Sequence, residues 1–197
     1  MFLMARWRQR QPWAVVLAFP FLFFMLDGLS SMGTDRALLR RVLSKELQNR
    51  AVGLLATQQL QVDRVGLPDG AFWSAYARLE AFNRCVYTPY AQRYELTVEA
   101  TAMSTVAAKA SKLLFRLPPK YYGKILADGA RRHTERLKVL VELSPTADRP
   151  FFRYVVEQER VQILASEKVR FHDFSGASDV LSDVVDRHAA AAFHECI

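Results

Sequence analysis

The sequence predicts an all-α protein in which an N-terminal membrane helix precedes a bundle of about five amphipathic helices. Three observations lead to this fold class. The chain opens with a basic and then apolar segment, apolar residues recur every three or four positions over most of the remainder, and no run alternates as a half-buried strand would. We therefore divide the chain into residues 1–33, a basic N-terminus with a membrane anchor, and residues 34–197, a helical domain.

The anchor is predicted from residues 12–26, which are uncharged and follow Arg6, Arg8 and Arg10. A basic segment followed by an apolar one is typical of secretory signal peptides and of uncleaved signal anchors. As a helix this stretch measures only about 22 Å, so crossing a bilayer core of about 30 Å requires extension past Asp27 towards Gly33. Its large aromatic side chains are expected in the membrane: Trp13, Phe19, Phe21, Phe23 and Phe24.

Arginine-rich N-termini that lack acidic residues also direct proteins to mitochondria. We therefore expect a protein of the mitochondrial inner membrane, with a bacterial or plastid membrane as the alternative. Basic residues flank the apolar stretch on both sides, so the positive-inside rule gives no orientation.

The first helix of the domain is expected over residues 34–65, where Leu39, Leu43 and Leu47 form one face. Charged residues of this stretch, including Glu46 and Arg50, are expected on the opposite, solvent-exposed face. A Pro-Asp-Gly sequence within residues 66–70 predicts the turn that follows.

Further helices are expected over residues 71–87, 89–116, 120–143, 151–171 and 177–193, with proline, glycine or a polar loop at the breaks. The segment 100–110 is rich in small residues, which permit close approach to another helix of the chain or of a partner.

The chain carries 27 Lys and Arg against 20 Asp and Glu, a net charge of +7. Such a balance suits an acidic protein, an anionic lipid or simply a solvated basic face. The densest basic segment is expected to contact a protein partner or a lipid headgroup such as that of cardiolipin. Its residues are Arg131, Arg132, Arg136 and Lys138. No nucleic-acid-binding signature accompanies them, so we do not expect nucleic acid as a partner.

No sequence motif links the chain to a reaction. Glycine-rich phosphate loops, Gly-x-Ser-x-Gly, His-Glu-x-x-His and Cys-x-x-Cys do not occur. A di-iron four-helix bundle needs Glu-x-x-His on two helices, and no glutamate here stands three residues before a histidine. We therefore expect no catalytic residue, no cofactor and no metal site. Cys85 is expected as a buried apolar residue, and spacing does not decide whether it pairs with Cys196.

Together these features favour a non-catalytic accessory or structural subunit of a large membrane complex, such as a respiratory-chain complex or ATP synthase. Its role would be assembly or scaffolding, with other subunits of the complex as its partners. Two alternatives stay open: a mitochondrial ribosomal or other RNA-associated protein, and a membrane-tethered helical enzyme whose site the sequence does not reveal.

Overall fold

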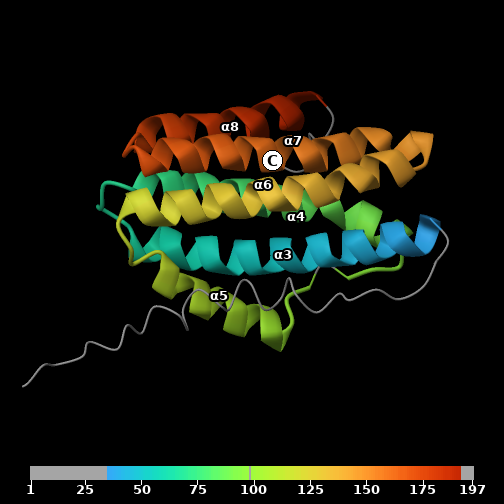
Figure 1. The fold of residues 1–197 in the computed structure, drawn as a ribbon, viewed down its shortest axis with the longest axis horizontal. Helices are drawn as coiled ribbons and strands as arrows, with labels where there is room; N and C mark the ends of the chain where they lie inside the picture. The colour runs from blue at the N-terminus through green and yellow to red at the C-terminus, as the bar shows by residue number, and fades with distance from the viewer. Residues whose placement is uncertain (1–34, 98, 192–197) are drawn as a thin grey trace, which may run out of the picture. The chain divides into compact units, whose positions relative to one another are not determined.

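A computed structural model describes residues 35–97 and 99–191 of the chain (Figure 1). This part is all-α, as predicted, and contains no strand. Its helices are α3 (Asp35–Asp63), α4 (Gly70–Arg93), α5 (Ala102–Leu114), α6 (Pro119–Leu143), α7 (Arg149–Arg170) and α8 (Phe174–Ala191), with a short 3₁₀ helix at Thr146–Asp148.

The predicted anchor lies outside the described residues, together with Trp13, Phe19, Phe21, Phe23 and Phe24. Its insertion into a membrane therefore stays a prediction. Among the helices that the structure does describe, none combines the length and the apolar character that a bilayer crossing requires.

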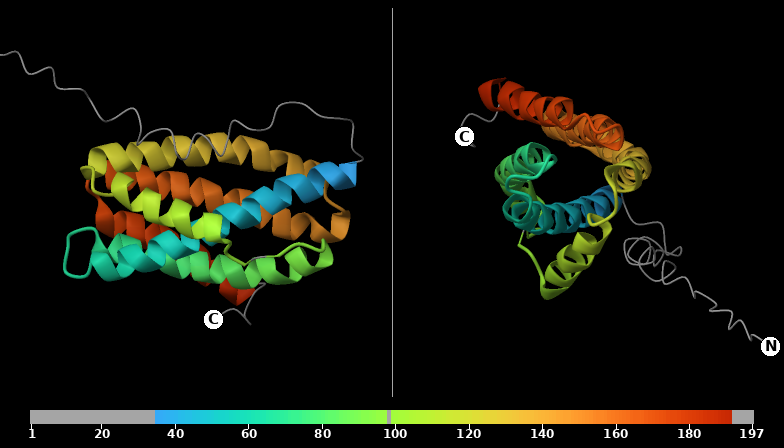
Figure 2. Two further views of the ribbon diagram at one scale, coloured as in Figure 1. Left: turned by 90° about the horizontal axis from the view of Figure 1, so that it is seen from below. Right: turned by 90° about the vertical axis from the view of Figure 1, so that its left-hand side faces the viewer.

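Two helical hairpins build the bundle (Figures 1 and 2). Helix α3 pairs with α4, α6 pairs with α7, and α3 also packs on α6. Helix α8 lies along both α4 and α7. The hairpins are joined by residues 94–118, which return along the bundle and include α5, packed on α3. A single long crossover of this kind is one of the recurrent connections of four-helix bundles.

Apolar periodicity accounts for most of the core. The predicted face of α3 is confirmed, since Leu39, Leu43 and Leu47 are all buried. Aromatic side chains fill the space between the hairpins: the ring of Trp73 meets Phe115 at 4.7 Å, centroid to centroid, and lies 5.9 Å from that of Tyr122. Burial of such large rings supplies much of the driving force for folding.

The helix predicted over residues 89–116 is wrong in its first third. Pro89 lies inside α4, which continues to Arg93, and residues 94–97 and 99–101 are not helical. Glu95 adopts a positive φ of 54°, a conformation that ends a right-handed helix. A new helix then starts at Ala102, where the side chain of Thr101 accepts a hydrogen bond from the Ser104 amide.

The small-residue segment makes its close approach within the chain. Ser104 and Ala108 are the buried residues of α5, which packs on α3. The larger apolar side chains of this helix, Met103, Val106 and Leu113, are exposed instead.

Candidate functional site

A cluster of charged side chains occupies the centre of the bundle, and each of four helices contributes to it. We call it the central network. Its charged or titratable members are Glu46 and Arg50 from α3, Glu80 from α4, His133 from α6 and Glu159 from α7. The expectation that Glu46 and Arg50 face solvent is wrong, because Glu46 is fully buried and the Arg50 side chain is only 12% exposed.

Arg50 meets three carboxylates. Its Nη1 donates to Glu80 Oε1 at 2.9 Å, and its Nη2 donates to Glu159 Oε1 at 2.7 Å. Its Nε lies 3.1 Å from Glu46 Oε1 without the geometry of a hydrogen bond. One guanidinium therefore ties α3 to both α4 and α7.

Glu46 connects this arginine to α6. Its Oε2 lies 2.5 Å from His133 Nε2, and its Oε1 accepts a hydrogen bond from the Tyr87 hydroxyl at 2.8 Å. The Nδ1 atom of His133 is buried and has no hydrogen-bond partner among the described groups. The network is thus extensive but not fully satisfied, which is uncommon for buried polar atoms.

Two amide side chains extend the network, each three residues after a glutamate. Asn83 follows Glu80, and Gln162 follows Glu159. Gln158 links them: its Oε1 accepts from Asn83 Nδ2 at 3.3 Å and from Gln162 Nε2 at 2.5 Å. Tyrosines close the ends, since Tyr154 donates to Asn83 Oδ1 at 2.5 Å and Tyr76 donates to Gln162 Oε1 at 2.6 Å.

Burial sets the electrostatics of the cluster. For Glu46, burial opposes ionisation, but Arg50 and His133 outweigh it and lower the pKa of the carboxyl to about 2. For Glu80, burial dominates and raises the pKa to about 7, with Arg50 only partly offsetting it. Burial also raises the pKa of Glu159. The carboxyls thus differ, and a proton is retained most readily on the α4 and α7 side.

The donor set fits a cation. The nearest ligand atoms of Glu46, His133 and Glu159 all lie within 4.8 Å of one another. Spacing along the sequence could not reveal this group, because its members come from three helices. The Glu-x-x-His pattern of di-metal bundles is indeed absent, but Glu80-x-x-Asn83 and Glu159-x-x-Gln162 place an amide where such bundles have histidine.

The central network has a recognisable signal in the sequence. Glu80 and Asn83 fall at i+4 and i+7 from Tyr76, and Glu159 falls at i+3 and i+4 from Val156 and Val155. Polar residues at these offsets stand on the apolar face of their helix. The periodicity of α3 instead predicts all its charged residues on the solvent-exposed face, and so misses Glu46 and Arg50.

A second candidate region lies at one end of the bundle, where three turns meet (Figure 1, left). They join α3 to α4 (64–69), α5 to α6 (115–118) and α7 to α8 (171–173). Arg64 donates to the carbonyl oxygen of Phe115, and Gly123 lies against the backbone of Ser166 and Arg170. We call this region the three-turn end.

The three-turn end exposes large apolar side chains. Six residues at or beside the turns are between 48% and 78% exposed: Val62, Val65, Leu67, Leu113, Tyr121 and Phe171. Single exposed apolar residues are ordinary, whereas a group of them on neighbouring turns is typical of an interaction surface.

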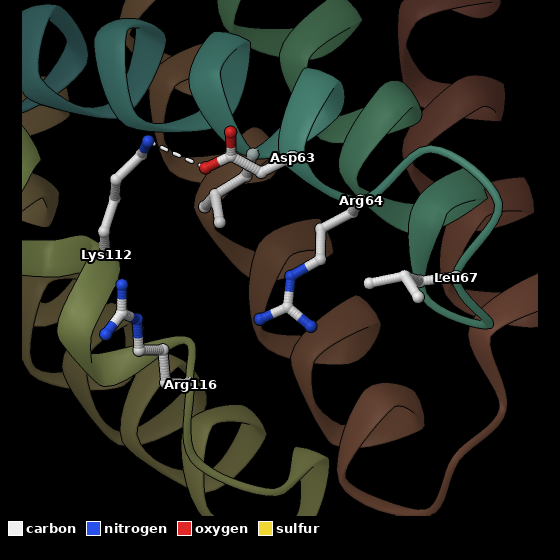
Figure 3. Close-up of a pocket in the computed structure, with 6 residues that line it drawn as sticks. Asp63, Arg64, Leu67, Lys112 and Arg116 are labelled. Atoms are coloured by element: carbon white, nitrogen blue, oxygen red, sulfur yellow. Dashed lines mark ion pairs between the residues drawn. The ribbon is translucent and has the colours of Figure 1, made fainter.

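A pocket of about 280 Å³ opens between α3 and α5 at this end (Figure 3). Lys112 pairs with Asp63 across it at 2.7 Å. Arg116 also lines the pocket and forms no ion pair with any described residue, and the same holds for Lys120 nearby. The surface beside the exposed apolar side chains therefore carries uncompensated positive charge.

The predicted basic segment lies on the surface of α6 and has partners within the chain. Arg131 pairs with Asp128 at 2.9 Å and also with Glu167 of α7, and Lys138 pairs with Glu135 at 2.6 Å. Arg132 and Arg136 are exposed on the same helix. Contact of these four residues with an acidic protein or a lipid stays a prediction.

Cys85 differs from expectation as well. It lies on α4 in a partly exposed position and is disulfide-bonded. The other cysteine of the sequence, Cys196, lies outside the described residues.

Comparison with known proteins adds no family to these observations: no protein-family model, no curated protein and no solved structure matches the chain.

Proposed function

We propose that this protein is a non-catalytic subunit that assembles or scaffolds a membrane-associated protein complex, and that the three-turn end is its docking surface. The observation that carries the proposal is the group of six exposed apolar side chains at or beside three neighbouring turns. Interfaces combine an apolar centre with a polar rim, and this end has both kinds of residue.

The charge of the surface indicates the chemistry of the partner. Arg116 and Lys120 lack acidic partners among the described residues, and Arg64 and Lys112 border the same pocket. An acidic, amphipathic protein segment complements this surface, because its carboxylates would meet these cations while its apolar side chains cover Leu67 and Leu113.

Two further features support a membrane location outside a reducing compartment. Structural disulfides persist in oxidising compartments, so the bridge at Cys85 favours a location outside a reducing cytosol. The basic and apolar N-terminus predicts a membrane anchor. Which complex and which membrane are involved, including the predicted mitochondrial inner membrane, is left to experiment.

The test replaces the chain in its source cells by a variant with Arg116→Glu and Lys120→Glu. We expect the complex that contains the wild-type chain to lose this subunit on native gels and to become less abundant. A matched control with Arg149→Glu and Arg153→Glu changes two exposed cations elsewhere on the bundle and should leave assembly unchanged.

A photo-crosslinking amino acid at Leu67 tests the partner directly, with Leu38 as the control position. We expect a protein crosslink from position 67 alone, to a segment rich in Asp and Glu. Crosslinks only to lipid would show that this end rests on a membrane, and normal assembly of the charge-reversed variant would show that it is not a docking surface. Either result contradicts the proposal.

A further inference from the structure

We infer that Glu46, His133 and Glu159 form a binding site for one divalent transition-metal ion in the centre of the bundle. The inference is independent of the proposed docking role, because the site is enclosed by α3, α6 and α7 and lies apart from the three-turn end.

The donor atoms carry the first step of the argument. Two carboxylates and one imidazole place ligand atoms within 4.8 Å of one another. Ligands that bind a common ion at about 2.0–2.2 Å lie within roughly 4.4 Å of each other, so small side-chain adjustments bring all three into range. Mixed carboxylate and imidazole donors suit Zn²⁺, Fe²⁺, Mn²⁺ or Co²⁺ better than the hard ions Ca²⁺ and Mg²⁺.

The second step concerns an unused donor. His133 is only 8% exposed, yet its Nδ1 has no hydrogen-bond partner among the described groups. A buried imidazole nitrogen normally finds a partner, because leaving it unsatisfied costs about 1–3 kcal/mol. Only Nε2, which faces Glu46, is engaged, so Nδ1 is a buried ligand atom that the described groups leave unused.

The third step is the balance of charge. The network holds three buried carboxylates but only one permanent cation, Arg50. Metal ions bind the deprotonated forms of these groups. With all three carboxylates ionised and His133 neutral, two negative charges are left beside Arg50 in a region from which water is excluded, and buried charge of this kind requires compensation. One divalent ion supplies that compensation in full.

Arg50 also limits the number of ions. Di-metal bundles place glutamates from all four helices, and histidines from two, around a pair of ions. Here the guanidinium of Arg50 donates to both Glu80 and Glu159, and Asn83 and Gln162 are weaker ligands than histidine. The arrangement leaves room for a single ion on the side of Glu46 and His133.

The experiment uses the full-length chain without a histidine tag, purified in mild detergent, stripped with EDTA and titrated with Co²⁺. We expect one Co²⁺ per chain by elemental analysis and a rise in Tm on binding. Affinity should fall at least tenfold in His133→Gln and in Glu159→Gln.

Two histidine variants serve as controls. His188 forms a similar pair with Glu157, 3.1 Å apart but at the surface, so His188→Gln should bind Co²⁺ as the wild type does. His194→Gln, which removes the imidazole beside Glu195 and Cys196, should do the same.

Circular dichroism in EDTA identifies any variant that does not fold. Should His133→Gln be unfolded, the isosteric Glu159→Gln and the wild-type stoichiometry still decide the question. Absence of Co²⁺ binding by the folded wild type, or equal binding by the folded Glu159→Gln variant, overturns the inference. Two ions per chain overturns the role given to Arg50.

Discussion

The central network and the three-turn end differ in whether their charged side chains have partners. In the network, Arg50 is shared among carboxylates from α3, α4 and α7, so buried charges from different helices pair with one another. At the three-turn end, Arg116 and Lys120 find no acidic partner among the described residues, and six apolar side chains are left uncovered. The difference indicates which region holds the fold together and which is available to another molecule.

The strongest test of this contrast removes the shared cation. Arg50→Met should lower the free energy of unfolding by about 3–5 kcal/mol, since it strands buried carboxylates without a partner. Urea unfolding followed by circular dichroism measures the change. Arg187→Met is the control, because Arg187 pairs with Glu157 at the surface and should contribute about 0–1 kcal/mol. Equal losses in the two variants would mean that the network does not stabilise the bundle.

A second pair of variants tests whether the three-turn end is rigid beneath its exposed side chains. A Cβ atom at Gly123 would lie 2.8 Å from the backbone of both Ser166 and Arg170, so Gly123→Ala should cost about 1–3 kcal/mol. Gly129, on the same helix, has no neighbour within 4 Å of that position. Gly129→Ala should therefore stabilise the protein by about 0.5–1 kcal/mol. Thermal melts should show a lower Tm for Gly123→Ala and a higher Tm for Gly129→Ala than for the wild type.

The network should also make stability depend on pH. Folded Glu80 keeps its proton until a pH of about 7, whereas the unfolded chain releases it near 4.5. Between these values the folded state binds more protons, so the free energy of unfolding should fall as pH rises. The charged groups that face Glu80 are Arg50 and Glu46 from α3 and Glu159 from α7.

Raised pKa values of Glu159 and His133 act in the same direction as that of Glu80. Glu46 acts in the opposite direction, because its low pKa makes stability fall as pH drops from 4.5 towards 2. Urea titrations in EDTA from pH 4 to 8 measure the slope, which Glu80→Gln should reduce. A flat profile for the wild type would contradict the ionisation states assigned to the network.

The smallest effect on stability is expected at the docking surface. Val65→Ser with Leu67→Ser should change the free energy of unfolding by no more than about 0.5 kcal/mol, because both side chains are exposed. Assembly of the complex in cells should nevertheless fall. A large loss of stability would show that these residues belong to the core of the bundle and not to an interface.

The fold could be predicted further than the site. Periodic leucines fixed the buried face of α3, and Pro118 with Pro119 marked the start of α6. Pro89 predicts a break between two helices, but α4 continues to Arg93, because an exposed proline near the end of a helix is accommodated within its last turn and a half. Leu164 of α7 is half exposed although it is apolar, since periodicity does not show how wide the buried face of a helix is.

The network could be predicted only in part. Polar residues on the apolar faces of α4 and α7 signal that something polar lies inside, but not what they meet. His133 and Glu46 are 87 residues apart, and no local pattern relates them. Their distance depends on the crossover that brings α6 beside α3, which is a property of tertiary packing.

The shared arginine has a consequence for synthesis of the protein. The α3–α4 hairpin alone can pair Arg50 with Glu46 and Glu80, but Glu159 arrives 66 residues after α4 ends at Arg93. Synthesis proceeds at roughly 5–20 residues per second, so the aromatic face of the α3–α4 hairpin is uncovered for about 3–13 s before Glu159 is added. Nascent chains whose part outside the ribosome ends just before or just after residue 159 should therefore differ in their resistance to protease.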